Sequence, residues 1–146
     1  MLKLIPPILT PELLFALASM GHGDELALVD AHFPADRIAA QGGGRLVRMP
    51  GLQTQVVLEA VLAVLPLDDF EPSCAWSMQV VGQSDAVPPA VGQFRHLLRE
   101  QGRGVDSLER QTFYARATAA RLLVQTGDLR TYANVLLRKG VLAVQE

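Results

Sequence analysis

The chain has 146 residues, of which 49% are hydrophobic and 19% are charged, and its formal net charge is −2. This length fits one domain with a real core, because a chain of this size buries about 68 to 70% of its unfolded surface. The small net charge and the lack of a Lys/Arg run argue against nucleic acid as a partner. The apolar fraction is at the upper end for a soluble domain, which favours an oligomer.

A membrane segment and a cleaved leader are both disfavoured by the sequence. The apolar N-terminal stretch is interrupted by Pro6 and Pro11, whereas a secretory signal needs an unbroken apolar helix. The apolar run 56–67 contains Glu59 and is too short to span a bilayer. The single cysteine, Cys74, excludes an internal disulfide, which suits a cytoplasmic protein.

Helix and strand patterns alternate along the chain. A helix begins at Pro11, because Thr10 is a good N-cap and proline suits the first helical position. Residues 26–29 form a continuous apolar run, typical of a strand buried on both faces. The predicted elements in chain order are a helix at 11–20, a strand at 26–29, a flexible loop, short strand and turn within 36–51, a helix at 53–65, a strand at 74–81, a helix at 89–101, a turn at 102–104, a helix at 110–120, a strand at 121–125, a turn at 127–128 and a strand at 134–137. This alternation predicts an α/β fold, and without a repeat or a composition break we expect one domain over 1–146.

The densest group of proton-transferring side chains surrounds the strand predicted at 26–29. His22 and Asp24 precede this strand, and Asp30 and His32 follow it. His22 lies between two glycines, which leave its imidazole accessible. Asp30 ends an apolar run, so its carboxylate must either meet donors there or bind a hydroxylated ligand. We interpret this region as a candidate active site.

Other interpretations of these residues are weaker but stay open. His22, Asp24, Asp30 and His32 are of the types that bind metal ions, but they match no metal-ligand spacing, and we expect no metal. The glycines at 42–44 lack the residues that follow them in a phosphate-binding loop. No motif of a nucleophilic enzyme is present. Asp24 can orient the His22 imidazole or serve as an ordinary loop carboxylate, and His32 can be a packed loop residue.

Polar side chains suited to ligand hydroxyls also occur in the C-terminal third. Tyr132 and Asn134 are two residues apart just before a predicted strand, so strand alternation places both on one side. Arg110 and Tyr114 lie on a predicted helix, where they are either surface residues or donors to a ligand.

Several segments of the chain resemble the fucose mutarotase and ribose pyranase (RbsD/FucU) family. The sequences at 22–25, His-Gly-Asp-Glu, and at 30–34, Asp-Ala-His-Phe-Pro, are similar to the L-fucose mutarotase branch. The resemblance covers nearly the whole chain. The matching segments are 11–14, 20–25, 30–35, 113–117, 126–127 and 132–140.

The resemblance implies a three-layer α/β/α domain and a mutarotase, an isomerase that interconverts the α and β anomers of L-fucose or a related pyranose through the open-chain sugar. It places the family histidine at His22, the sugar-binding aspartate at Asp30, the sugar-contacting arginine at Arg110, and the Tyr-x-Asn element at Tyr132 and Asn134. It also implies rings, commonly decamers, in which a neighbouring subunit completes each sugar site.

We hypothesise that His22 and Tyr132 carry the two proton transfers of anomer exchange, which needs no metal, nucleotide or flavin. The other three implied residues would hold sugar hydroxyls, and Trp76 offers an apolar face to the sugar ring. The segments 41–45 and 76–78 depart from the family pattern and leave the preferred sugar open. A non-catalytic sugar-binding or regulatory protein and a ribose-type pyranase are the alternatives.

Overall fold

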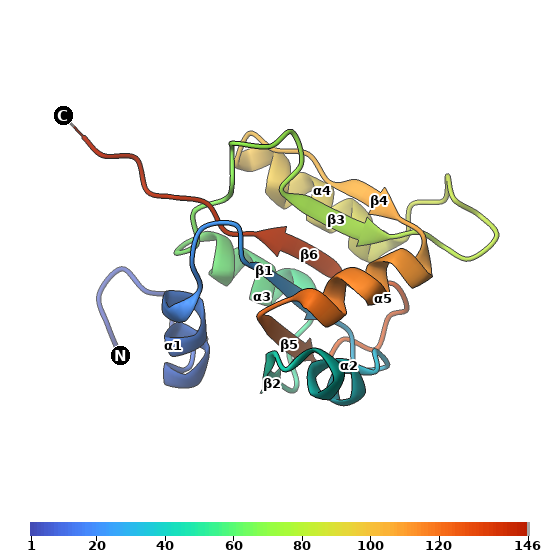
Figure 1. Ribbon diagram of the computed structural model, residues 1–146, viewed down its shortest axis with the longest axis horizontal. Coiled ribbons are helices and arrows are strands. Elements are labelled where there is room, and N and C mark those ends of the chain that lie inside the picture. Colours follow the sequence, from blue (N-terminus) through green and yellow to red (C-terminus); the bar gives the residue numbers. More distant parts are fainter. Residues whose placement is uncertain (146) are drawn as a thin grey trace.

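Helices cover both faces of one six-stranded sheet in the computed structural model, which describes residues 1–145 (Figure 1). Helices α1, α3 and α4 pack on one face, and α2 and α5 pack on the other. The predicted α/β/α domain is therefore confirmed. The elements are α1 (Pro11–Ser19), β1 (Glu25–Val29), α2 (Ala35–Gly42), β2 (Arg45–Met49), α3 (Thr54–Leu62), β3 (Ala75–Met78), α4 (Pro89–Glu100), β4 (Asp106–Leu108), α5 (Arg110–Ala119), β5 (Leu122–Thr126) and β6 (Val135–Arg138).

The sheet has the strand order β2-β5-β1-β6-β3-β4. Strand β1 pairs with β5 in parallel and with β6 in antiparallel orientation, and β3 is antiparallel to β6 and parallel to β4. Strand β6 therefore runs against all the others. As a result, the segment that leads into β6 lies at the same edge of the sheet as the carboxyl ends of the other five strands.

Strand β1 lies at the centre of the sheet and is buried on both faces. Leu26 and Leu28 pack with the core beneath α1, α3 and α4, whereas Ala27 and Val29 pack with the core beneath α2 and α5. All four side chains are fully buried. This arrangement confirms the predicted strand and explains its unbroken apolar sequence, because neither face meets water.

The segment after β1 differs from the sequence prediction. Residues 36–42 were expected to form a flexible loop, but they belong to helix α2, which is capped after Gly42 by Gly43 in a left-handed conformation (φ 73°). A Cβ atom at Gly42 would lie 1.7 Å from the carbonyl oxygen of Thr118 in α5. The glycine therefore permits close packing of two helices and does not mark a loop. The predicted short strand is confirmed as β2.

The remaining predicted elements agree with the structure within a few residues, and β4 was not predicted. Thr10 caps α1, as expected, since its Oγ1 accepts a hydrogen bond of 3.2 Å from the Leu13 N–H. Among residues 1–145, none of the helices combines the length and the apolar character needed to cross a bilayer.

Two glycine substitutions are predicted to change stability in opposite directions. Gly127→Ala places a Cβ atom 2.4 Å from the Gly51 backbone nitrogen, and we expect this overpacking to cost about 1–3 kcal/mol. Gly92→Ala, within α4, meets no atom within 4 Å and should stabilise the fold by about 0.5–1 kcal/mol. Urea unfolding of both variants measures the two changes, and equal midpoints for Gly127→Ala and the wild type would contradict the predicted clash.

Candidate functional site

A cavity of about 190 Å³ opens at the carboxyl edge of the sheet. It contains four of the six predicted site residues, Asp30, Arg110, Tyr132 and Asn134, which are up to 104 residues apart in the chain. The strand directions bring them together: Asp30 follows β1, Arg110 begins α5 just after β4, and the other two precede β6. The cavity is also lined by His32, Phe33, Met78, Tyr114 and Thr131.

Asp30 is held rigidly at this cavity although it is only 3% exposed. Its backbone N–H donates to Asn134 Oδ1 over 2.8 Å, and its Oδ1 accepts from the His32 N–H over 3.0 Å. Burial raises the pKa of the Asp30 carboxyl, and hydrogen bonds from the backbone and from Asn134 only partly oppose this effect. A rigid carboxyl with a raised pKa is suited to bind a hydroxyl group or to exchange a proton with it.

Tyr132 has an unusual backbone conformation, with a positive φ of 61°. Non-glycine residues rarely adopt this conformation, and those that do are often found at functional sites. The phenolic oxygen accepts a hydrogen bond of 3.2 Å from the Val81 N–H. The phenolic hydrogen is therefore free to be donated to a ligand in the cavity.

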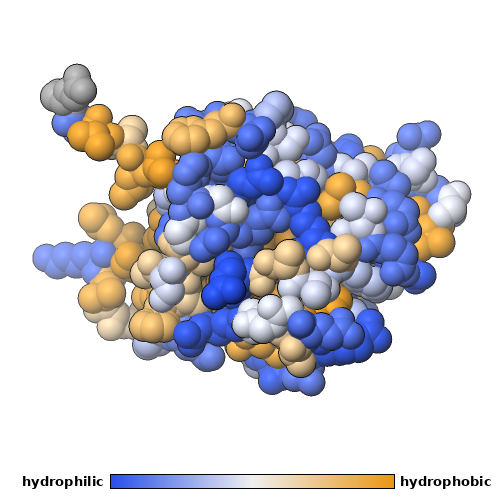
Figure 2. Space-filling view, viewed as in Figure 1, coloured by the Kyte–Doolittle hydropathy of each residue, from blue (hydrophilic) through white to orange (hydrophobic). Residues whose placement is uncertain are grey.

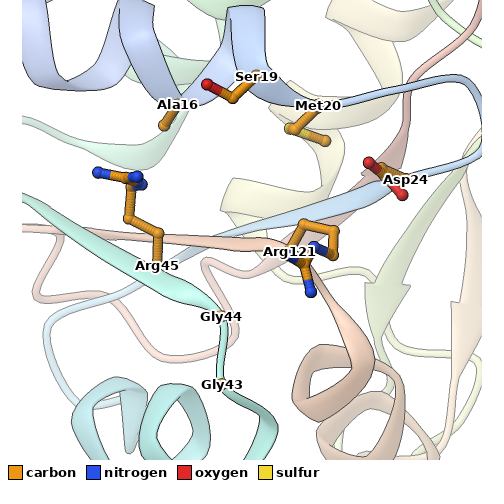
Figure 3. Close-up of a pocket in the computed structure, with 8 residues that line it drawn as sticks. All are labelled: Ala16, Ser19, Met20, Asp24, Gly43, Gly44, Arg45 and Arg121. Atoms are coloured by element: carbon orange, nitrogen blue, oxygen red, sulfur yellow. The ribbon is translucent and has the colours of Figure 1, made fainter.

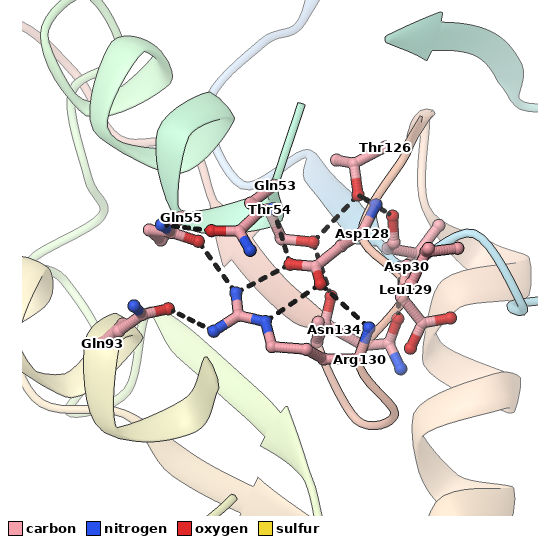
Figure 4. Close-up of polar contacts among 12 residues, drawn as sticks. Asp30, Gln53, Thr54, Gln55, Gln93, Thr126, Asp128, Leu129, Arg130 and Asn134 are labelled. Carbon is pink, nitrogen blue, oxygen red and sulfur yellow. Dashed lines mark hydrogen bonds and ion pairs between the residues drawn. The ribbon is translucent and has the colours of Figure 1, made fainter. Parts of the chain in front are cut away.

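The loop that carries Tyr132 is fixed by an ion pair at its base (Figure 4). Arg130 forms a two-nitrogen contact with the buried Asp128 carboxylate, over 3.0 and 2.8 Å. The same guanidinium donates to Gln55 in α3 and Gln93 in α4, each over 2.8 Å. Burial raises the pKa of Asp128, but the hydrogen bonds and the charge of Arg130 outweigh it and lower the pKa to about 2.

His22 lies at the opposite, amino edge of the sheet. Its Nε2 is 3.0 Å from Oδ1 of Asp68, which precedes β3, and its ring packs edge-on against Phe70 with centroids 4.5 Å apart. The His22 side chain is 38% exposed, and that of Asp68 is 2% exposed. Burial raises the pKa of Asp68, but hydrogen bonds from His22 and Phe70, together with the charges of His22 and Arg138, lower it overall.

The two predicted catalytic residues therefore do not meet within one chain. Strand β1 has five residues between the His22 loop and Asp30, which corresponds to roughly 17 Å at the rise of a β-strand. His22 is absent from the carboxyl-edge cavity that contains Tyr132. Contact between the two side chains requires a second copy of the chain.

Trp76 also lies outside the cavity, beneath a group of charged side chains. The residue is 5% exposed, and the Arg116 guanidinium lies over the face of its ring at 3.6 Å from the ring centroid. Arg116 is held there by Glu25, with two hydrogen bonds of 2.8 Å. Arg138 also pairs with Glu25 and approaches Asp68 at 3.7 Å. Within one chain, this face of the indole is occupied by a cation.

The remaining polar residues near β1 have structural partners. Asp24 accepts a hydrogen bond of 2.8 Å from the Gly21 N–H, so it serves as an ordinary loop carboxylate. The carboxylate that contacts the His22 imidazole is that of Asp68. His32 Nε2 lies 3.0 Å from the Leu129 carbonyl oxygen, but His32 is exposed and lines the cavity, so it is not the packed loop residue that the sequence favoured. Within residues 1–145, His, Cys, Asp and Glu side chains do not gather in groups of three or more that fit a metal ion.

A second cavity, of about 380 Å³, lies beside the end of α1 (Figure 3). It is lined by Arg45 and Arg121 together with Asp24, whose carboxylate is already bound to backbone. Among the described residues, its lining includes none of the six predicted site residues and no histidine or tyrosine. The carboxyl-edge cavity is therefore the better candidate site.

Sequence reasoning missed two aspartates of this arrangement, Asp68 and Asp128. Asp128 comes shortly after the apolar strand β5, just as Asp30 follows β1, so the same pattern could have identified it. Asp68 carries no comparable local signal, because its partner His22 is 46 residues away in sequence.

This architecture defines a class: a three-layer α/β protein with a small polar cavity, suited to a hydroxylated ligand, where the strands end. The chain belongs to the RbsD/FucU transport protein family, whose model matches residues 3–142. It is 44% identical to the fucose mutarotase of Homo sapiens over 148 residues, which cover 98% of this chain and 96% of the human protein.

Solved structures give the same result. The crystal structure of the fucose mutarotase from Streptococcus pneumoniae in complex with L-fucose has a TM-score of 0.87 at 36% identity, covering 97% of this chain and 100% of that one. Bacillus subtilis RbsD complexed with D-ribose has a TM-score of 0.76 at 22% identity, covering 98% of this chain and 100% of that one. At 22% identity, the similarity to Bacillus subtilis RbsD concerns the fold alone.

Asp128 and Asp30 are predicted to respond differently to replacement by asparagine. Because the pKa of Asp128 is lowered to about 2, its charge stabilises the folded state by about 2 kcal/mol at neutral pH. Asp128→Asn should lose this contribution at pH 7. The difference from wild type should shrink as the pH falls below about 4 and through about 2, because the wild-type carboxyl then takes up its proton in the folded state.

Asp30→Asn is the matched control, since both carboxyls are buried. The pKa of Asp30 is raised, so its charge does not stabilise the fold, and this variant should keep wild-type stability at pH 7. Urea unfolding across this pH range measures both variants. Equal losses at pH 7 would contradict the opposite environments assigned to the two carboxyls.

Proposed function

We propose that this chain is a mutarotase that interconverts the α and β anomers of L-fucose, working as one domain over 1–146 without a cofactor. The observation that carries the proposal is the cavity where Asp30, Arg110, Tyr132 and Asn134 converge. Relatives over nearly the whole chain are fucose mutarotases, and one of them was solved with L-fucose.

The reaction needs two proton transfers. The anomeric hydroxyl loses a proton while the ring oxygen gains one, the ring opens to the aldehyde, and it closes on the other face. We assign the transfers to His22 and Tyr132, an imidazole and a phenol that each can hold and release a proton. Asp30, Arg110 and Asn134 then hold the sugar hydroxyls.

We further propose that the site is shared between copies in a ring-shaped homo-oligomer, with a decamer as the expected form. The His22 imidazole of one copy would face the cavity of its neighbour. One exposed apolar side chain lies near each of these two places: Phe70, 68% exposed, packs on the His22 ring, and Leu129, 77% exposed, lies beside the cavity. Burial of such side chains favours association.

Further apolar surface lies where the two termini leave the domain, on the left in Figure 2. Leu2, Leu4, Leu142 and Val144 are all more than 60% exposed there.

For Trp76, contact with the sugar stays a prediction, and in one chain it requires Arg116 to leave the indole face. The single thiol, Cys74, is buried and free, which fits the cytoplasmic location that we propose.

His22→Ala is predicted to lower the rate of anomer exchange about 10²- to 10⁴-fold and to leave the fold intact. NMR magnetisation exchange between the anomeric protons of L-fucose measures this rate. His96→Ala is the matched control, because His96 is an exposed histidine of α4 that pairs with Glu100 at 3.2 Å. Wild-type protein that binds L-fucose without accelerating exchange would overturn the proposed function in favour of a sugar-binding protein.

Mixing two inactive variants tests the shared site. When His22→Ala and Tyr132→Phe proteins are unfolded together and refolded, about a quarter of the sites in random oligomers combine an intact His22 with an intact Tyr132. Activity should then return toward about a quarter of the wild-type rate, whereas each variant refolded alone stays inactive. If both residues act within one chain, the mixture will show no recovery.

A further inference from the structure

The imidazole of His22 is oriented by its own chain, independently of any neighbouring copy. One edge of the ring is bound through Nε2 to Asp68, and the ring packs at an interplanar angle of 80° against Phe70. No partner for Nδ1 occurs among residues 1–145, and the side chain is 38% exposed. Only the Nδ1 edge is therefore available to a ligand.

Asp68 is itself fixed from several directions. Its Oδ1 accepts a second hydrogen bond, of 3.2 Å, from the Phe70 N–H, and its Oδ2 lies 3.7 Å from the Arg138 guanidinium. Its backbone carbonyl accepts a hydrogen bond from Arg103, which also binds the carbonyls of Glu71 and Pro72. The carboxylate therefore has little freedom to turn away from the histidine.

We propose that Asp68 is a positioning residue that keeps the proton of neutral His22 on Nε2, so that Nδ1 is the nitrogen that exchanges a proton with the sugar. This inference rests on the proposed function of His22. An ionised carboxylate accepts hydrogen bonds and donates none, so a histidine nitrogen at 3.0 Å from it must carry the hydrogen. The lowered pKa of Asp68 agrees with an ionised carboxylate at neutral pH.

The arrangement defines which nitrogen of His22 exchanges a proton with the sugar. With Nε2–H donated to Asp68, the Nδ1 lone pair accepts the proton of the anomeric hydroxyl or, after protonation, returns a proton to the sugar. The imidazolium formed in between stays paired with the Asp68 carboxylate. An orienting carboxylate of this kind fixes both the tautomer and the ring position of a catalytic histidine.

The tautomer is measured directly by ¹⁵N NMR of protein labelled at histidine, with His22→Gln to assign the signal among the three histidines of the chain. We expect a protonated Nε2 and an unprotonated Nδ1 in neutral wild-type His22. A neutral His22 with its hydrogen on Nδ1 would overturn the proposal. This measurement needs no variant of Asp68 and no activity, so it remains informative even if the mutarotase assignment fails.

Activity of Asp68→Ala provides the second readout. We expect kcat for anomer exchange to fall about 10- to 100-fold with KM nearly unchanged, together with a mixture of both His22 tautomers. Asp69→Ala is the matched control, because Asp69 is the exposed neighbour in sequence and should keep wild-type rates and the wild-type tautomer. An Asp68→Ala protein that retains both the single tautomer and kcat would overturn the positioning role.

Discussion

The direction of β6 against the other five strands is the constraint on which the rest of the structure depends. It places the start of β6, with Asn134, at the edge where β1 ends with Asp30, and it places the end of β6, with Arg138, at the edge where His22 lies. One edge therefore gathers groups suited to hold a hydroxylated ligand. The other edge gathers a histidine and the charged side chains around it.

The two edges differ in how they hold their side chains. At the carboxyl edge, the Tyr132 loop is fixed by Arg130 on a buried aspartate, and the cavity has an Asp30 carboxyl with a raised pKa. At the amino edge, Asp68 with a lowered pKa holds the His22 ring, which remains partly exposed. Both groups of side chains are thus held by hydrogen bonds and ion pairs within their own chain, and such preorganisation is what precise proton transfer needs.

Local patterns in the sequence predicted much of the fold. The apolar run of β1 and the Thr10 cap of α1 were recognisable because they depend on neighbouring residues. Helix α2 was misread because Gly42 and its neighbours are typical of loops, whereas the glycine serves a close approach to α5, 76 residues later in the chain. Contacts of that kind leave no local pattern.

The same distinction applies to the site. Asp30 and Tyr132 were identified from residue type, position next to a strand and family resemblance, and the structure brings them to one cavity. The separation of His22 from Asp30 follows from the strand between them, which the sequence pattern does reveal. The placement of Tyr132 and Asn134 beside Asp30 follows from the antiparallel direction of β6, which the sequence pattern does not reveal. The Asp68 partner of His22 and the Arg116 cover on Trp76 depend on long-range packing and required the structure.

A crystal structure of the assembled protein with L-fucose is the decisive measurement for the shared site. We expect a sugar in the carboxyl-edge cavity, in contact with Asp30 and Arg110, with Nδ1 of a neighbouring copy's His22 within hydrogen-bond distance of the anomeric or ring oxygen. A sugar bound in the cavity beside Arg45 and Arg121, or a carboxyl-edge site that no second copy approaches, would contradict this expectation.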